Sequence, residues 1–162
     1  MALVDYFMKI DGIKGESKDA KHKDEIELLS YGFGSTQPTT MDFGGGGGAG
    51  KAQLQDFLFT MNVNISSPKL WLACCTGDHI KSAIFTARKA GKEQKDYFRI
   101  VLEQVMVSNY QSGGTNEANG VPVDSVSLSY AKMVIHYDIQ DEKGLVKPGA
   151  RAGYDLKEMQ LV

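Results

Sequence analysis

Long apolar runs and a basic leader are both missing from this 162-residue sequence. No stretch approaches the roughly 20 apolar residues that a membrane-spanning helix needs. Residues 1–6 lack the basic segment and the long apolar segment that mark a Sec signal peptide. We therefore expect no membrane insertion, a cytoplasmic location before any export, and an export route that requires no such signal.

Cysteine and net positive charge are also scarce. The two cysteines, Cys74 and Cys75, are adjacent. Neighbouring cysteines form a disulfide only in a strained ring, and two thiols do not complete a zinc site, so we expect reduced, partly buried thiols. The formal net charge of -2 at pH 7 argues against nucleic acid as a partner, because a phosphate-backbone binder usually carries a strong basic excess.

Residues that could carry catalysis are few and scattered. Three histidines show neither metal-ligand spacing nor a neighbouring nucleophile motif, and we expect each to be solvated or hydrogen-bonded: His22, His79 and His136. A group of carboxylates lies among lysines and is predicted to form a solvated face: Asp19, Asp24, Glu25 and Glu27. Paired carboxylates are recognised only in three dimensions. The sequence predicts no catalytic residue, no metal and no cofactor.

A run of glycines is the segment that most suggests a ligand. Gly45, Gly50 and Lys51 match most of the phosphate-binding pattern G-x-x-x-x-G-K-[ST], but Ala52 stands where a hydroxyl must ligate Mg²⁺. A phosphate-binding loop also precedes a helix, whereas the residues after Lys51 lead into an alternating strand. Both facts disfavour a nucleotide-binding enzyme. The alternatives are a flexible surface loop and a loop that becomes ordered against a neighbouring subunit.

Alternation of apolar and polar residues predicts a mainly β domain. The clearest pattern spans residues 57–65, where one face is apolar: Phe57, Phe59, Met61, Val63 and Ile65. Further strands are predicted at residues 4–10, 25–33 and 80–88. Two long runs flank a turn-rich stretch and predict a β-hairpin over residues 96–140. Its apolar set changes phase near Lys132, which predicts a bulge and a bent strand, as in a barrel or curved sheet.

Residues 67–76 break the β pattern and predict one short helix beside the barrel. Helix signals occur at both ends: Ser66 or Ser67 as a cap, Pro68 in the first turn and Gly77 at the left-handed closing position. Three residues are expected to face the core: Leu70, Trp71 and Cys74. The whole chain, residues 1–162, is thus predicted to be one β-barrel or β-sandwich domain. Its long strand edges favour self-association; a monomeric β-domain adaptor or binding module is the alternative.

The chain also resembles the Hcp family (haemolysin-coregulated protein, TssD) over nearly its whole length. The order and spacing of short matches carry the resemblance: FMKIDGIKGES at 7–17, His22, 25–26, 49–51, 56–57, 59–60, SPKL at 67–70, 73–74, TGDH at 76–79, RKAG at 88–91, 126–128 and Tyr137. The resemblance implies a compact β-barrel of two curved sheets with one short flanking α-helix and extended loops. It also implies a structural, non-enzymatic subunit of a type VI secretion system, whose hexameric rings stack into an inner tube.

Partners and site residues follow from the same resemblance. The implied partners are other copies of the chain, a VgrG spike at the tube tip, a contractile sheath that propels the tube outward, and effector proteins in the lumen. Within the projecting loop, residues 36–52, the segment that resembles the contact to the adjacent ring is Thr39, Thr40, Met41, Asp42, Phe43, Gly44, Gly45, Gly46, Gly47, Gly48, Ala49, Gly50 and Lys51. Candidate lumen residues are Ser30, Gly32 and Gly34. Candidate subunit-interface residues, predicted to form a charged turn or rim contact, are Arg88, Lys89 and Lys92.

Overall fold

The computed structural model describes residues 4–39, 50–89, 94–117, 120–143 and 145–162. Within these ranges the chain is mainly β with a single α-helix, which confirms the predicted fold class. The elements in chain order are β1 (Val4–Ile10), β2 (Ile26–Leu28), β3 (Ser30–Gly32), β4 (Ser35–Thr36), β5 (Gln53–Leu54), β6 (Phe57–Asn62), α1 (Ser67–Thr76), β7 (Ile80–Lys89), β8 (Asp96–Gly113), β9 (Val123–Ser129), β10 (Lys132–Gln140), β11 (Val146–Asp155) and β12 (Gln160–Leu161).

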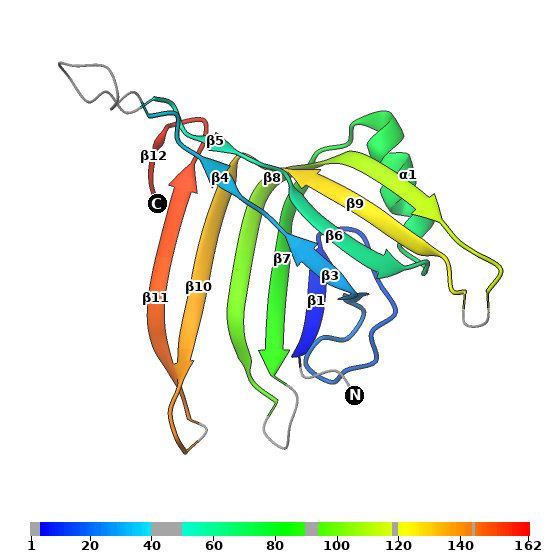
Figure 1. Ribbon diagram of the computed structural model, residues 1–162, viewed down its shortest axis with the longest axis horizontal. Coiled ribbons are helices and arrows are strands. Elements are labelled where there is room, and N and C mark those ends of the chain that lie inside the picture. Colours follow the sequence, from blue (N-terminus) through cyan, green and yellow to red (C-terminus); the bar gives the residue numbers. More distant parts are fainter. Residues whose placement is uncertain (1–3, 40–49, 90–93, 118–119, 144) are drawn as a thin grey trace.

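Strand β8 is shared by two branches of the sheet (Figure 1). Its residues 96–105 pair with β7 and its residues 106–113 pair with β9. One branch continues from β7 through β1 to β2, and the other from β9 through β6 to β3. Leu29 alone separates β2 from β3, and its N–H donates to the Thr60 carbonyl at 2.8 Å. The two branches therefore face each other across a common interior.

The predicted phase change in the long hairpin is a break between two strands. β9 ends at Ser129 and β10 begins at Lys132. Tyr130 and Ala131 therefore carry the chain from the β9–β6–β3 branch to the edge of β8 opposite β7, where β10 pairs. The register of the β8–β9 ladder also shifts between Val107 and Asn109. The chain thus accommodates the change of apolar face by ending one strand as well as by a bulge.

The core lies between the two branches and against the helix. Its largest fully buried side chains come from six strands and the helix: Phe57, Phe59, Phe85, Met8, Ile26, Met61, Leu70, Ile100, Leu102, Leu128, Val105 and Val126. The apolar face predicted for residues 57–65 is correct only as far as Met61. Val63 and Ile65 are 42% and 62% exposed, because β6 ends at Asn62 and the chain then turns toward the helix.

Helix α1 spans the expected residues, but neither serine at its start caps the helix with its side chain as predicted. Ser66 is the N-cap residue and makes no side-chain cap, because its hydroxyl bonds to Asn64 Oδ1 at 2.6 Å. The Ser67 hydroxyl donates instead to buried Asp124 at 2.6 Å. The end is as predicted: Gly77 closes the helix at φ 67°.

The helix presents a narrower face to the core than predicted. Leu70 is fully buried and Cys74 packs against the core as a half-buried side chain. Trp71, which was expected to face the core, is 55% exposed. The expectation for Trp71 is therefore wrong: only one narrow stripe of this short helix contacts the sheet.

Strands β10, β11 and β12 extend the sheet on the side opposite α1 (Figure 1). β11 was not predicted, and it pairs with β10 along most of its length. Its residues 147–152 are exposed, so its side chains show no alternation of polarity from which a strand could be predicted.

Candidate functional site

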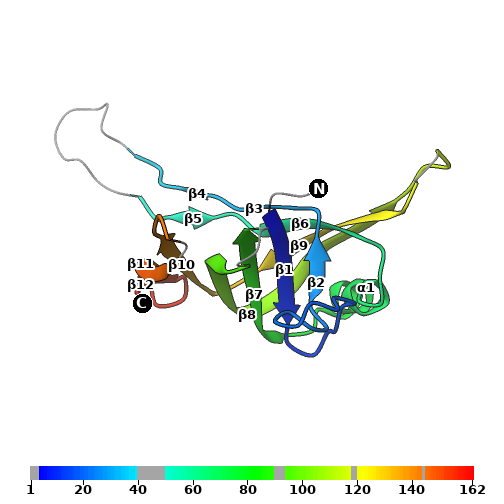
Figure 2. The ribbon, with the colours of Figure 1, turned by 90° about the horizontal axis from the view of Figure 1, so that it is seen from below.

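An arm projects from the body toward the upper left of Figure 1, and Figure 2 shows it from below. We define the arm as residues 34–39 and 50–55. Its base is a two-residue antiparallel ladder, Ser35 with Leu54 and Thr36 with Gln53. The Gln55 N–H also donates to the Gly34 carbonyl at 2.9 Å. A few backbone contacts thus hold the arm together without burying it.

The arm carries the two ends of the predicted ring-stacking loop. The Gly50 N–H donates to the Pro38 carbonyl at 3.1 Å, and the Gln37 amide donates to the Gly50 carbonyl. Thr39, Gly50 and Lys51 are exposed. The other ten predicted stacking residues, 40–49, lie outside the described residues. After Lys51 the chain enters β5 and β6, so the strand predicted after the glycine run is confirmed and the helix that a phosphate-binding loop requires does not follow.

An apolar groove of ≈ 270 Å³ lies where the arm meets β10, β11 and β12. Apolar groups of the arm and of these strands line it: Phe33, Leu54, Met133, Ile135, Tyr154 and Leu161. At its floor the Tyr130 hydroxyl donates to the Gln55 carbonyl at 2.8 Å. Burial, with the nearby Asp56 carboxylate, raises the pKa of Tyr130 to about 12. The hydroxyl therefore remains a donor at neutral pH and ties the arm to the body.

Two candidate lumen residues, Ser30 and Gly32, lie in β3, and the third, Gly34, lies at the base of the arm. Ser30 pairs with Thr60 in the β3–β6 ladder, and their hydroxyls are hydrogen-bonded. Gly32 borders open space, since a Cβ placed there would meet no atom within 4 Å. The Gln55 side chain covers Gly34, with Oε1 2.8 Å from the position a Cβ would take. The side chains at and around these positions are therefore small or polar and carry no charge.

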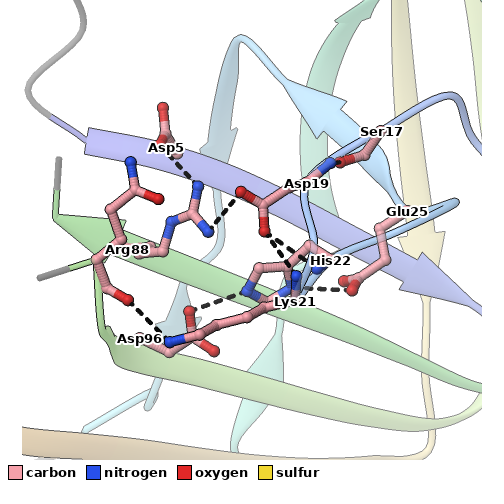
Figure 3. A network of polar contacts seen from close by, with 9 residues as sticks. Asp5, Ser17, Asp19, Lys21, His22, Glu25, Arg88 and Asp96 are labelled. Carbon is pink, nitrogen blue, oxygen red and sulfur yellow. Dashed lines mark hydrogen bonds and ion pairs between the residues drawn. The ribbon is translucent and has the colours of Figure 1, made fainter.

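Arg88 was predicted to form a charged turn or rim contact, but its side chain is buried. Its side chain is 4% exposed and lies between two carboxylates, with Nη1 2.8 Å from Asp19 Oδ2 and Nη2 3.2 Å from Asp5 Oδ2 (Figure 3). The guanidinium also lies over the Phe7 ring at 4.9 Å. Burial would lower the pKa of Arg88, but Asp19 and Asp5 outweigh it and raise the pKa. Arg88 thus acts first within its own subunit.

Asp19 is held as a carboxylate by the same contacts. Burial would raise its pKa, but the Lys21 N–H and the Arg88 guanidinium outweigh burial and hold the pKa of the carboxyl below its ordinary value. The His22 N–H also donates to Asp19 Oδ1 at 3.2 Å. The carboxylate therefore connects the loop between β1 and β2 to the end of β7.

His22 makes the second connection of this loop. The side chain is 7% exposed, with Nδ1 2.8 Å from Glu25 Oε2 and Nε2 2.9 Å from Asp96 Oδ1 (Figure 3). The imidazole stacks on the Phe7 ring with centroids 4.3 Å apart. Arg88 is the penultimate residue of β7 and Asp96 begins β8, so the loop residues Asp19 and His22 fix both sides of the β7–β8 connection.

The sequence did not predict this network. The contacts within it also correct two expectations. Asp19 and Glu25 were expected on a solvated face, but both are bound by buried side chains. Asp5 is 83 positions from Arg88 and Asp96 is 74 positions from His22 in the sequence, and no local pattern encodes pairings of that kind. One local signal exists: His22 stands among the polar residues 17–25. A stretch with so few apolar residues cannot bury a side chain by itself, so burial of His22 requires residues from elsewhere in the chain.

The other two candidate interface residues differ from Arg88. Lys89 is exposed, and its ammonium lies 5.3 Å from the centre of the Tyr97 ring. Lys92 lies outside the described residues. Within the described part of the chain, no cluster of three or more His, Cys, Asp or Glu side chains could hold a metal ion. The helix found in those ranges is too short and too polar to cross a membrane.

Comparisons with known proteins agree over nearly the whole chain. Residues 7–137 match the family model described as "Type VI secretion system effector, Hcp". The chain is 39% identical over 157 residues to protein hcp1 of Pseudomonas aeruginosa, covering 96% of both chains.

Solved structures give the same result. The crystal structure of Hcp1 from Salmonella typhimurium matches with a TM-score of 0.79 and 28% identity, over 99% of this chain and 100% of that chain. A structure described as a type six secretion system protein matches with a TM-score of 0.92 and 26% identity, over 98% of this chain and 99% of that chain. The family match and the identity to the Pseudomonas protein together establish that this chain belongs to the Hcp family of type VI secretion proteins.

Proposed function

We propose that this chain forms hexameric rings that stack into the inner tube of a type VI secretion system. On contraction of the surrounding sheath the tube is propelled outward behind a VgrG spike, and its lumen carries effector proteins. The chain is cytoplasmic before this step and leaves the cell with the tube. Family membership itself establishes the coarser part: the chain is a secreted structural component of type VI secretion and not an enzyme.

The single observation that carries the proposal is the arm. It leaves the body on a two-residue ladder and carries exposed residues Thr39, Gly50 and Lys51 away from the core. A segment built this way adds little to the stability of its own subunit, and its exposure supports a role in contact with another one. We assign the predicted loop, residues 39–51, to the contact between stacked rings.

The surfaces at the two sides of the molecule support a ring. β11 and α1 lie at opposite sides of the molecule (Figure 1). Residues of β11 line the apolar groove, and α1 exposes Trp71 and Leu72. A closed ring requires this kind of arrangement, because one face of each subunit must meet a different face of the next. Of the three candidates for the subunit contact, Lys89 and Lys92 keep that assignment, whereas Arg88 is engaged within its own subunit. Ser30, Gly32 and Gly34 are assigned to the lumen.

Native mass spectrometry and electron microscopy of the purified protein test the proposal. The expected result is a species six times the subunit mass of 17.7 kDa and images of rings, with stacked rings at high concentration. A single 17.7 kDa species at every concentration would instead support the monomeric adaptor. Tight ATP binding that disappears in Lys51→Ala would support the nucleotide-binding alternative.

A further inference from the structure

A lysine-lined hollow of ≈ 470 Å³ lies between the β1–β2 loop and α1. Figure 2 shows this loop beside α1, below β1. The floor is apolar: Ile10 is buried and Ile13 is half-buried, and the two are joined by a backbone hydrogen bond of 3.1 Å. The hollow is lined by five lysines: Lys9, Lys14, Lys21, Lys23 and Lys69. The hollow is separate from the arm and from the groove beside β11.

Four of these lysines have no partner within the described part of the chain. Lys21 donates to the Gln94 carbonyl at 3.3 Å, but no ion pair or side-chain hydrogen bond engages the ammonium groups of the others, Lys9, Lys14, Lys23 and Lys69. The lining also contains Asp11, Asp24 and Glu25, so five ammonium groups stand against three carboxylates and the hollow carries a local positive potential. The chain as a whole has a net charge of -2, so this potential is a local feature.

We propose that this hollow binds an acidic segment of a partner protein, with carboxylates opposite the lysines and an apolar side chain over Ile10 and Ile13. Acidic residues at the hollow favour a protein segment over a nucleic acid as the ligand. Asp11 and Asp24 are exposed at the same hollow and would repel the closely spaced phosphates of a nucleic acid. A protein segment can place its carboxylates opposite the lysines and a hydrogen-bond donor opposite these aspartates.

Fluorescence anisotropy with a short fluorescein-labelled peptide of glutamate, leucine and glycine tests this assignment. The test variant is Lys14→Gln with Lys23→Gln and Lys69→Gln, which leaves the contact of Lys21 intact. The control variant is Lys143→Gln with Lys147→Gln and Lys157→Gln, three exposed lysines between the end of β10 and the start of β12 that do not line the hollow. Both variants change the net charge equally. Circular dichroism should show that both remain folded.

The wild-type protein should bind the peptide, and binding should weaken as salt is added. The test variant should bind about tenfold more weakly, since each exposed charge pair contributes a modest amount and three are removed. The control variant should stay within about twofold of wild type, and a peptide with glutamine in place of glutamate should not bind.

Several results would overturn the proposal. No binding by the wild-type protein, or equal losses in the two variants, would show that the hollow is not a specific site. Tighter binding of single-stranded DNA or of vesicles containing anionic lipid would assign the hollow to a phosphate ligand instead. A loss of oligomer mass in the test variant alone, without a change in peptide binding, would make a second copy of this chain the occupant.

Discussion

The arm and the network around Arg88 and His22 differ in how firmly the chain is fixed to the body of the subunit. The network buries the Arg88 and His22 side chains against four carboxylates and connects the β1–β2 loop to both sides of the β7–β8 connection. The arm has a two-residue ladder and exposed side chains. The difference separates two tasks: the network stabilises a single subunit, whereas the arm is free to contribute to contacts between subunits. Variants that affect stability and assembly separately can break or sharpen this comparison.

Arg88→Met should cause the largest loss of stability. Asp5 and Asp19 would lose their shared cation, and breaking a buried ion pair on one side costs about 3 kcal/mol or more of unfolding free energy. Urea denaturation measures this loss. Lys89→Met is the matched control: among the residues that the structure describes, the exposed Lys89 ammonium contacts the Tyr97 ring alone, which is worth about 0.5 kcal/mol. Equal losses in the two variants would contradict a stabilising role for the Arg88 contacts.

His22→Phe should have the second largest effect. Phenylalanine can keep the stack on Phe7 but loses the contacts to Glu25 and Asp96, at a cost of about 2 kcal/mol. Hydrogen exchange should become faster at the amides of Gly15 and Ser17, whose bonds to Asp24 and Glu25 close the loop. In the exposed control His79→Phe these amides should exchange as in wild type, and a similar acceleration there would argue against the role of His22.

Asp19→Asn should have a smaller effect that depends on pH, because Arg88 keeps its contact with Asp5. The pKa of Asp19 is lower in the folded chain, so the carboxylate stabilises the fold above its unfolded-state pKa of about 4. This contribution is lost as the pH falls through the folded pKa. The stability difference between wild type and Asp19→Asn should therefore be full at pH 7 and shrink below about pH 4. A difference that stays constant down to pH 2 would contradict the assignment.

Deleting residues 45–48 should have the smallest effect on stability and a clear effect on assembly. The deletion lies beyond the ladder of the arm, and shortening a loop changes its closure entropy only slightly. We expect unchanged urea denaturation and single rings, but fewer stacked rings in electron micrographs. Unchanged tube formation would refute the role of this loop in ring stacking.

The sequence predicted the elements whose signals are local. The strand from Phe57 and the stop at Gly77 are correct because alternation and a left-handed glycine operate over a few residues. The predicted strand from Phe57 was too long, because it was expected to reach residue 65 and β6 ends at Asn62. Val63 and Ile65 continue the alternation, but the Asn64 side chain accepts the Ser66 N–H at 2.8 Å and turns the chain out of the strand. A single polar side chain thus overrides the apolar pattern.

Long-range features could not be predicted from one sequence. β11 contains Pro148, Gly149 and Gly153 and exposes most of its side chains, so neither propensity nor alternation indicates a strand. The burial of Arg88 depends on carboxylates from β1 and from the β1–β2 loop, which only the folded sheet brings together. The lysine-lined hollow has the same origin, since Lys69 of α1 meets lysines from the β1–β2 loop.

The sharing of β8 between two branches of the sheet has a consequence for the order of folding. β7, β8, β9 and β10 follow one another along the chain, so their ladders close short loops, whereas β1 must find β7 across about 80 residues and pay a larger loop-closure entropy. We expect β8 and its sequence neighbours to form the nucleus, with β1 and the β1–β2 loop joining last. Newly made chains would then expose the β7 edge that β1 later covers, and that edge is where premature association between subunits would begin.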